Sequence, residues 1–125
     1  MGPRPSNHEI CKKVADALVI LKAGARMMVV SRHYYSDLAD LELDSPEEFQ
    51  DLLVVLLGEI QRLGPTECYA GGRPPQRSYD KELTNVELWA FCWHSERLKK
   101  KMYLKFALQK DCYIHVDCHE SSPKN

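Results

Sequence analysis

Two successive segments in the last third of the chain alternate between apolar and polar residues with a period of two. In residues 99–108 the apolar side chains share one face, and Tyr103 and Lys105 share the other. In residues 112–119 the same alternation turns Cys112, Ile114, Val116 and Cys118 inward. Each segment is therefore predicted to be a β-strand with one buried and one solvent-facing side. The outward side chains predicted for the second strand are Tyr113, His115, Asp117 and His119.

A third strand is predicted upstream, over residues 86–94. Trp89 and two further aromatic residues fall on one face and His94 on the other, and both faces are largely apolar, which is typical of a central strand. Residues 67–70 are expected to form a further short strand. The Gly- and Pro-rich residues 71–76 that follow predict a loop with fixed turns.

The first half of the chain carries apolar residues at helical spacing. Ser6 and Glu9 form a capping-box pattern ahead of a helix predicted over residues 7–23. Residues 26–30 indicate either a short edge strand or a turn. Residues 31–41 have the spacing of a short helix.

The strongest helix signal begins at Ser45. Ser45 is the expected N-cap, Pro46 takes the first helical position and Glu48 completes a capping box. Apolar residues then recur at helical spacing until Gly64, where a following proline ends the helix.

Helices followed by an antiparallel meander predict an α+β fold, in which N-terminal helices pack on one face of a C-terminal antiparallel sheet. Residues 1–125 are of the length expected for a single domain. We expect residues 1–64 to form its mainly helical part, residues 66–119 its sheet, and residues 120–125 a flexible tail.

The balance of acidic and basic residues also changes near the boundary between the helical part and the sheet part. Residues 1–62 hold 7 Lys and Arg against 10 Asp and Glu, whereas residues 63–125 hold 10 against 8. A basic sheet half suits a protein that offers one face to a polyanion. An ordinary solvated surface explains the same numbers equally well.

No apolar stretch reaches the length of a membrane span, and the N-terminus lacks the apolar core of a signal peptide, so we expect a cytoplasmic protein with no membrane partner. The five cysteines lie at irregular spacings and are expected to be reduced thiols. A zinc site is disfavoured, because strand alternation turns Cys112 and Cys118 away from His115 and His119. No cofactor is predicted.

Phenol, ammonium and imidazole groups on one sheet face have the chemistry of a metal-independent ribonuclease. A base must take the proton of the ribose 2'-hydroxyl, cations must stabilise the phosphoryl oxygens, and an acid must protonate the leaving oxygen. His119 is predicted to be the base or the acid, and Tyr103 a hydrogen-bond donor or acid. Lys105 and Lys81 are the predicted catalytic cations. The residues predicted to bind RNA are Arg73, Arg77, Tyr69, Tyr79, His94, His115 and Lys101.

The chain resembles the MqsR-type toxins, mRNA interferases within the RelE-like superfamily of bacterial toxin-antitoxin systems. The resemblance spans most of the chain. It is carried by residues 21–24 at a helix end, residues 41–44 before a helix, residues 67–69 after it, Trp89, and residues 102–105.

The resemblance implies a RelE-like α+β fold, cleavage of single-stranded mRNA, and neutralisation by a cognate antitoxin. Tyr103 would hold the family's catalytic tyrosine position. The chain departs from the family at three positions: Ala70 replaces a lysine, Ala90 replaces a glutamine, and His119 replaces a C-terminal lysine. Some other RelE-like toxins, such as HigB, carry a histidine near the C-terminus.

The competing hypothesis is a non-enzymatic module that binds protein or nucleic acid on the same fold. Whether the ribosome is a further partner is left open, as are the cleavage sequence and the oligomeric state. Fold alone does not decide between enzyme and binding module.

Overall fold

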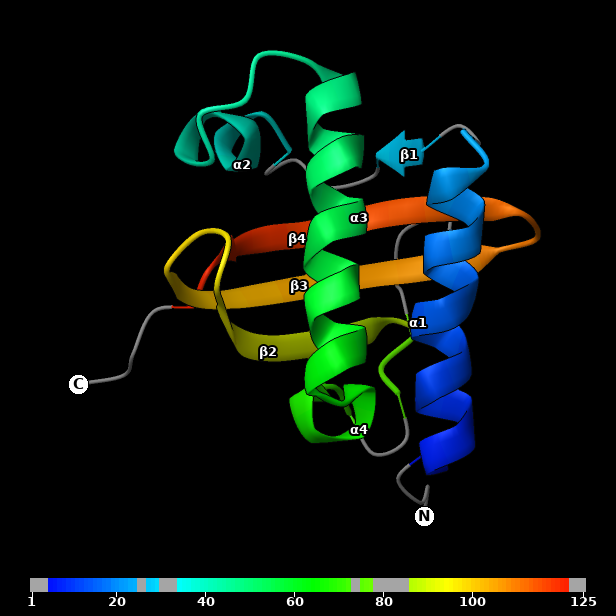
Figure 1. The fold of residues 1–125 in the computed structure, drawn as a ribbon. Helices are drawn as coiled ribbons and strands as arrows, with labels where there is room; N and C mark the ends of the chain where they lie inside the picture. The colour runs from blue at the N-terminus through cyan, green and yellow to red at the C-terminus, as the bar shows by residue number, and fades with distance from the viewer. Residues whose placement is uncertain (1–4, 25–26, 30–33, 73–74, 78–85, 122–125) are drawn as a thin grey trace.

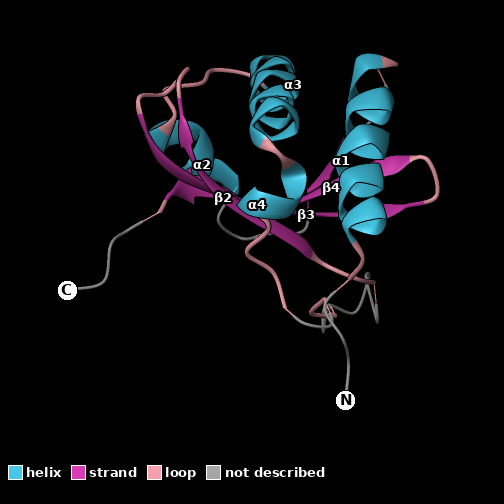
Figure 2. Cartoon of the chain, turned by 60° about the horizontal axis from the view of Figure 1, so that its bottom comes forward, coloured by secondary structure: helices cyan, strands magenta, loops and turns pink. Residues whose placement is uncertain are grey.

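The computed structural model describes residues 5–24, 27–29, 34–72, 75–77 and 86–121. Four strands form one sheet in the order β1-β4-β3-β2, and two long helices, α1 and α3, cover one of its faces (Figures 1 and 2). The elements in chain order are α1 (Asn7–Lys22), β1 (Met27–Val29), α2 (Tyr34–Asp40), α3 (Pro46–Leu63), α4 (Pro65–Cys68), β2 (Trp89–Ser95), β3 (Lys100–Gln109) and β4 (Cys112–Glu120).

The predicted α+β class is confirmed, with helices first and the sheet mainly in the C-terminal part. β2, β3 and β4 form the expected antiparallel meander. β1, which the sequence left open between strand and turn, is an edge strand and pairs with β4 in parallel. The sheet is therefore mixed rather than wholly antiparallel.

Both predicted helix caps are present. The Ser6 hydroxyl accepts a hydrogen bond from the backbone N–H of Glu9 at 3.0 Å, and the Ser45 hydroxyl accepts one from Glu48 at 3.2 Å. The Glu48 carboxylate in turn accepts from the backbone N–H of Asp44 at 2.7 Å. These contacts satisfy N–H groups near each helix start that have no partner within the helix.

The main core lies between the two long helices and the inward face of the sheet. The apolar stripes of α1 and α3 meet side chains from β2, β3 and β4, because each helix has one face that must be removed from water. The largest fully buried side chains are Trp89, Tyr113, Phe49, Phe91, Phe106, Ile10, Leu53, Leu56, Leu57, Ile60 and Met102.

A β-bulge in β4 overturns part of the predicted alternation. Lys105 pairs with Asp117, but the next residue of β3, Phe106, pairs with His115, so Val116 is an extra residue on β4. An extra residue exchanges the two faces of the strand on one side of the bulge. The prediction that Tyr113 and His115 face outward is therefore wrong, and both side chains are fully buried.

The bulge also moves the residues that were expected to point inward with Cys118. Ile114 packs in a second, smaller cluster with Leu88 and Ala107, and Cys112 and Val116 lie against that cluster. Cys118 itself is buried in the main core, as predicted. The alternation thus holds at the C-terminal end of β4 and fails before the bulge.

Two further predictions about the strands are wrong. Most of residues 67–70 do not form a strand: Pro65–Cys68 is the short helix α4, and Tyr69 makes a single antiparallel bridge to Phe91. β2 is an edge strand rather than a central one, since it stands last in the sheet order. On its second face Ala90 is buried and Cys92 is half-buried, whereas His94 is exposed.

None of the helices among the described residues has both the length and the apolar content to cross a bilayer.

Candidate active site

The face of the sheet opposite α1 and α3 carries ionisable and aromatic side chains. In β3, Tyr103 and Lys105 alternate with buried residues of the core, so they point to this face. Cross-strand pairing places His119 beside Tyr103 and Asp117 beside Lys105. We call this surface the open sheet face. It is defined by six residues: His94, Lys101, Tyr103, Lys105, Asp117 and His119.

The rings of Tyr103 and His119 stack on one another. Their centroids lie 5.4 Å apart and their planes meet at 30°. The Lys105 ammonium nitrogen lies 5.8 Å from the centroid of the Tyr103 ring. A proton-transferring imidazole, a phenol and a cation are therefore neighbours on one half-exposed surface, an arrangement that can hold an anion and exchange protons with it.

The hydrogen bond of the His119 ring fixes its neutral tautomer. Nδ1 lies 3.0 Å from the carbonyl oxygen of Glu120. A carbonyl oxygen can only accept, so Nδ1 carries the hydrogen and donates it. In the neutral ring the lone pair is then on Nε2, which makes no hydrogen bond to the described part of the chain. Nε2 of His119 is thus the atom able to accept a proton from a bound molecule.

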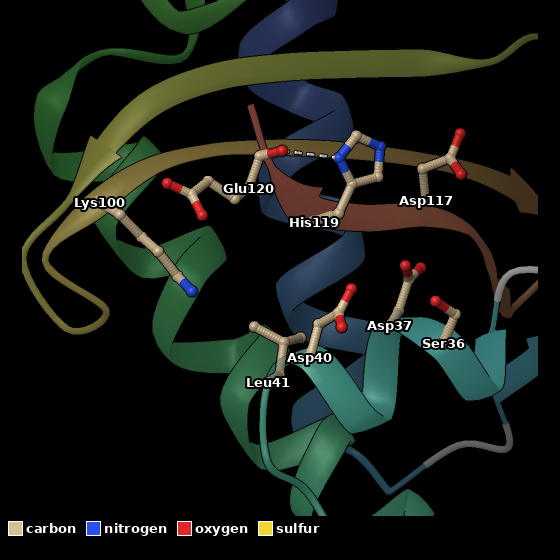
Figure 3. A pocket seen from close by; sticks show the side chains of 8 residues that line it. All are labelled: Ser36, Asp37, Asp40, Leu41, Lys100, Asp117, His119 and Glu120. Carbon is tan, nitrogen blue, oxygen red and sulfur yellow. Dashed lines mark hydrogen bonds between the residues drawn. The ribbon is translucent and has the colours of Figure 1, made fainter. Parts of the chain in front are cut away.

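A cavity of about 670 Å³ lies between α2 and the end of β4, next to His119 (Figure 3). Four carboxylates line it, together with His119 and one lysine. Such a lining repels a phosphate, so an anion approaching His119 is favoured on the side of Lys105 and Tyr103 rather than in this cavity. The lining residues are Ser36, Asp37, Asp40, Leu41, Lys100, Asp117, His119 and Glu120.

Of the predicted catalytic residues, the structure brings Tyr103, Lys105 and His119 together. Lys81 lies outside the described residues, and so do two of the residues predicted to bind RNA, Arg73 and Tyr79.

Two other predicted RNA-binding residues lie on the open sheet face. His94 is exposed and pairs across the strands with Lys101. Lys101 lies two residues before Tyr103 on the same face of β3. Lys101 adds a positive charge to this surface, and His94 adds another when its ring is protonated.

Tyr69 and Arg77 have local contacts elsewhere. The Tyr69 hydroxyl donates a hydrogen bond to the carbonyl of Gly72 at 2.6 Å, and its half-buried ring packs near Trp89 and Phe91. The Arg77 guanidinium is exposed and lies 4.0 Å from the carboxylate of Glu87, at the limit of an ion pair.

His115 does not belong to the open sheet face, and its prediction as an RNA-binding residue is corrected. The bulge turns its ring into the core, where Nε2 lies 3.2 Å from a carboxylate oxygen of Asp37. The ring packs edge-on against Phe49, with centroids 5.0 Å apart. A side chain with no exposed surface cannot contact RNA.

Asp37 is a buried carboxylate that the sequence reasoning did not single out. It is 3% exposed and binds both His115 and the backbone N–H of Cys118. A signal for it existed, because Asp37 lies beside Leu38 and three residues after Tyr34, on the apolar face of a predicted helix. A carboxylate in such a stripe has to find partners in the core.

The thiols offer no nucleophile in the core. Burial, followed by the nearby carboxylates of Asp37 and Asp117, raises the pKa of Cys118 far above its ordinary value. Burial likewise raises the pKa of Cys68. A thiol with a raised pKa stays protonated and unreactive near neutral pH. Among the residues that the structure describes, no group of three His, Cys, Asp or Glu side chains is arranged to hold a metal ion.

The fold and this site define an α+β domain that carries a histidine, a tyrosine and lysines on the sheet face opposite α1 and α3. Comparisons of the chain with protein-family models, with curated proteins and with solved structures found no match.

Proposed function

We propose that the protein is an mRNA endoribonuclease of the toxin type, which cleaves single-stranded RNA by attack of the 2'-hydroxyl without a metal ion. The observation that carries the proposal is the stacked pair of Tyr103 and His119, with the Lys105 ammonium beside it. Three groups of different chemistry thereby meet on one face of the sheet. We place its action in the cytoplasm, under the control of a cognate antitoxin.

In this proposal each group has a separate role. Nε2 of the neutral His119 ring takes the proton of the 2'-hydroxyl, whose oxygen then forms a bond to phosphorus. The bond from phosphorus to the 5'-oxygen breaks, and the Tyr103 hydroxyl protonates this leaving oxygen. Lys105 stabilises the negative charge on the phosphoryl oxygens. The products are a 2',3'-cyclic phosphate and a 5'-hydroxyl end.

The resemblance to the MqsR-type toxins supports the same surface. Of the four positions at which the family carries its site residues, Tyr103 and His119 stack on one another. The other two, Ala70 and Ala90, are joined by a backbone hydrogen bond of 2.8 Å, and Ala90 pairs across the strands with Lys105. Ala90 thus lies on the same face as Lys105, and Ala70 lies beside it along the edge of β2.

The same two alanines favour a second candidate function, a binding module without activity. Where the family has a lysine and a glutamine, this chain has neither charge nor amide, and four carboxylates line the cavity beside His119. A domain of this kind would bind a partner through the open sheet face but perform no chemistry.

Cleavage of a mixed-sequence single-stranded RNA, in the presence of a chelator, distinguishes the two functions. We expect the wild-type protein to produce 2',3'-cyclic phosphate ends. His119→Ala and Tyr103→Phe should each slow cleavage by about a hundredfold or more, because each removes a proton-transfer group. His8→Ala and Tyr35→Phe change the same residue types at exposed positions on helices and should leave the rate unchanged.

Two outcomes contradict the enzyme. If the wild-type protein binds RNA or a protein partner but cleaves no RNA, the binding module is correct. If cleavage occurs and survives the change His119→Ala together with Tyr103→Phe, the open sheet face is not the catalytic site.

A further inference from the structure

The carboxylate of Asp37 makes two contacts with β4 through one oxygen. Oδ2 lies 3.2 Å from Nε2 of His115 and accepts a hydrogen bond from the backbone N–H of Cys118, also at 3.2 Å. Asp37 belongs to α2, so these contacts tie a short helix to the strand that carries His119. Asp37 also lines the cavity beside His119 (Figure 3).

The contact between Asp37 and Cys118 lies beyond the part of β4 that pairs with β1. β1 pairs with Tyr113–His115 only, so from Val116 onward no strand among the described residues pairs with the outer edge of β4. An unpaired backbone N–H at a buried position costs free energy unless another group accepts from it. Asp37 supplies that acceptor at Cys118, the residue directly before His119.

The orientation of the carboxylate is fixed by His115. A carboxylate only accepts, so Nε2 of His115 carries the hydrogen and donates it to Asp37. The ring is held between Tyr34 and Phe49, with centroid distances of 5.8 and 5.0 Å. In this tautomer Nδ1 of His115 carries a lone pair, and it has no hydrogen-bond partner in the described part of the chain.

We infer that Asp37, oriented by His115, is a positioning residue for His119. By holding the backbone N–H of Cys118, it sets the path of β4 past the bulge and keeps the His119 ring stacked on Tyr103. Asp37 does not touch the reacting atoms. The inference rests on the proposed function for its effect on catalysis, and its effect on the His119 ring is independent of activity.

The test compares variants by two readouts, the NMR resonance of the His119 Cε1–H group and the rate of RNA cleavage. Asp37→Leu replaces the carboxylate with an apolar side chain of roughly similar size and so removes the acceptor. The His119 resonance should move, because the ring current of Tyr103 depends on the stacking geometry. Cleavage should fall about tenfold or more in kcat with little change in KM, since misplacement of a catalytic group slows the chemical step.

Two further variants separate positioning from general damage. Asp37→Asn retains an acceptor oxygen, so it should restore the wild-type resonance and most of the activity. Asp40→Leu removes a carboxylate from the same helix and the same cavity, but not a contact with β4, and it should leave the resonance unchanged. A folded Asp37→Leu protein with the wild-type His119 resonance would overturn the inference.

The wild-type protein provides a second measurement in case Asp37→Leu does not fold. The Cys118 amide should exchange with solvent as slowly as the amides of the neighbouring strand, because Asp37 accepts its hydrogen bond. Rapid exchange at Cys118 would overturn the inference in the same way. If the wild-type protein cleaves no RNA, the proposed function fails, whereas the resonance and exchange measurements still decide the role of Asp37.

Discussion

His115 and His119 lie four positions apart on one strand, yet one ring is buried and the other is half-exposed. His119 is half-exposed, stacks on Tyr103 and makes no hydrogen bond through Nε2 to the described part of the chain, whereas His115 is fully buried and donates to Asp37. The residue type alone therefore says little about function. What separates a chemical role from a structural one is the face of the strand on which each ring lies.

Glu59 illustrates a buried charge with a purely structural role. Its carboxylate accepts hydrogen bonds from the indole N–H of Trp93 and the backbone N–H of Arg97, both at 2.9 Å, and is 4% exposed. Burial on its own would raise the pKa of Glu59, but hydrogen bonds from Trp93, Arg97 and Ser95 outweigh it and hold the pKa below its usual value. Glu59 thereby connects α3 to the β2–β3 hairpin.

The change Glu59→Gln should lower the free energy of unfolding at neutral pH by about 1 to 3 kcal/mol, because the amide turns an N–H group toward one of the two donors. The loss should depend on pH. A folded-state pKa below the unfolded value, about 4.3 for Glu, stabilises the fold above that value, and this contribution disappears as the pH falls through the folded-state pKa.

Urea unfolding at neutral and acid pH measures both effects. The difference between wild type and Glu59→Gln should be large near neutrality and shrink in acid. Glu96→Gln, at an exposed position of the same hairpin, serves as the control and should have a small effect at both pH values. A difference that grows in acid would contradict the assigned direction of the Glu59 pKa.

At the level of the elements, local signals predicted the helices well and strand faces only in part. Capping residues and apolar spacing located α1 and α3, because both act within a few residues of the chain. The bulge at Val116 depends on pairing between two strands and leaves no mark in an alternating sequence. Tyr103 and His119 could be predicted to share a face because they pair directly, with no bulge between them. The face of His115 could not be predicted, because the bulge lies between His115 and His119.

Partners distant in sequence explain the other differences. β1 is too short to be identified by its own pattern and is a strand because β4 pairs with it. Residues 67–70 are rich enough in apolar side chains for a strand, but Pro65 begins a helical turn that ends at Cys68. The contact between Asp37 and Cys118 joins residues 81 positions apart, which no local pattern contains.

Gly64 joins α3 to α4 and should resist substitution more than Gly24. Gly64 has φ +111°, outside the left-handed helical region, whereas Gly24 has φ +76° and nothing within 4 Å of an added Cβ. Gly24→Ala should cost about 1 kcal/mol, the usual penalty of a left-handed backbone for a residue with a side chain. Gly64→Ala should cost more, because its backbone conformation is less accessible still.

Urea midpoints of the two alanine variants test this ordering. Equal losses would mean that the chain relaxes at Gly64, and that the junction between α3 and α4 does not require its present backbone angles.

On the scale of the whole molecule, charge follows the two layers of the fold. The mainly helical residues 1–62 carry an excess of acidic groups, and α1 and α3 lie together on one side of the sheet (Figure 2). Lys101 and Lys105 lie on the opposite side, with His94 and His119. A net charge of -1 therefore conceals a molecule whose sheet face can attract a polyanion while its helical layer does not.

This separation predicts which lysines determine the salt dependence of RNA binding. Each lysine that contacts a phosphate of single-stranded RNA contributes about 0.7 to the slope of log affinity against log salt concentration. Lys101→Gln and Lys105→Gln should therefore each weaken binding and reduce the slope by about that amount. Lys22→Gln removes the same charge from the exposed end of α1 and should change neither quantity. If Lys22→Gln has as large an effect as Lys105→Gln, then RNA responds to total charge rather than to the open sheet face, and neither the enzyme nor a nucleic-acid-binding module can be assigned to that face.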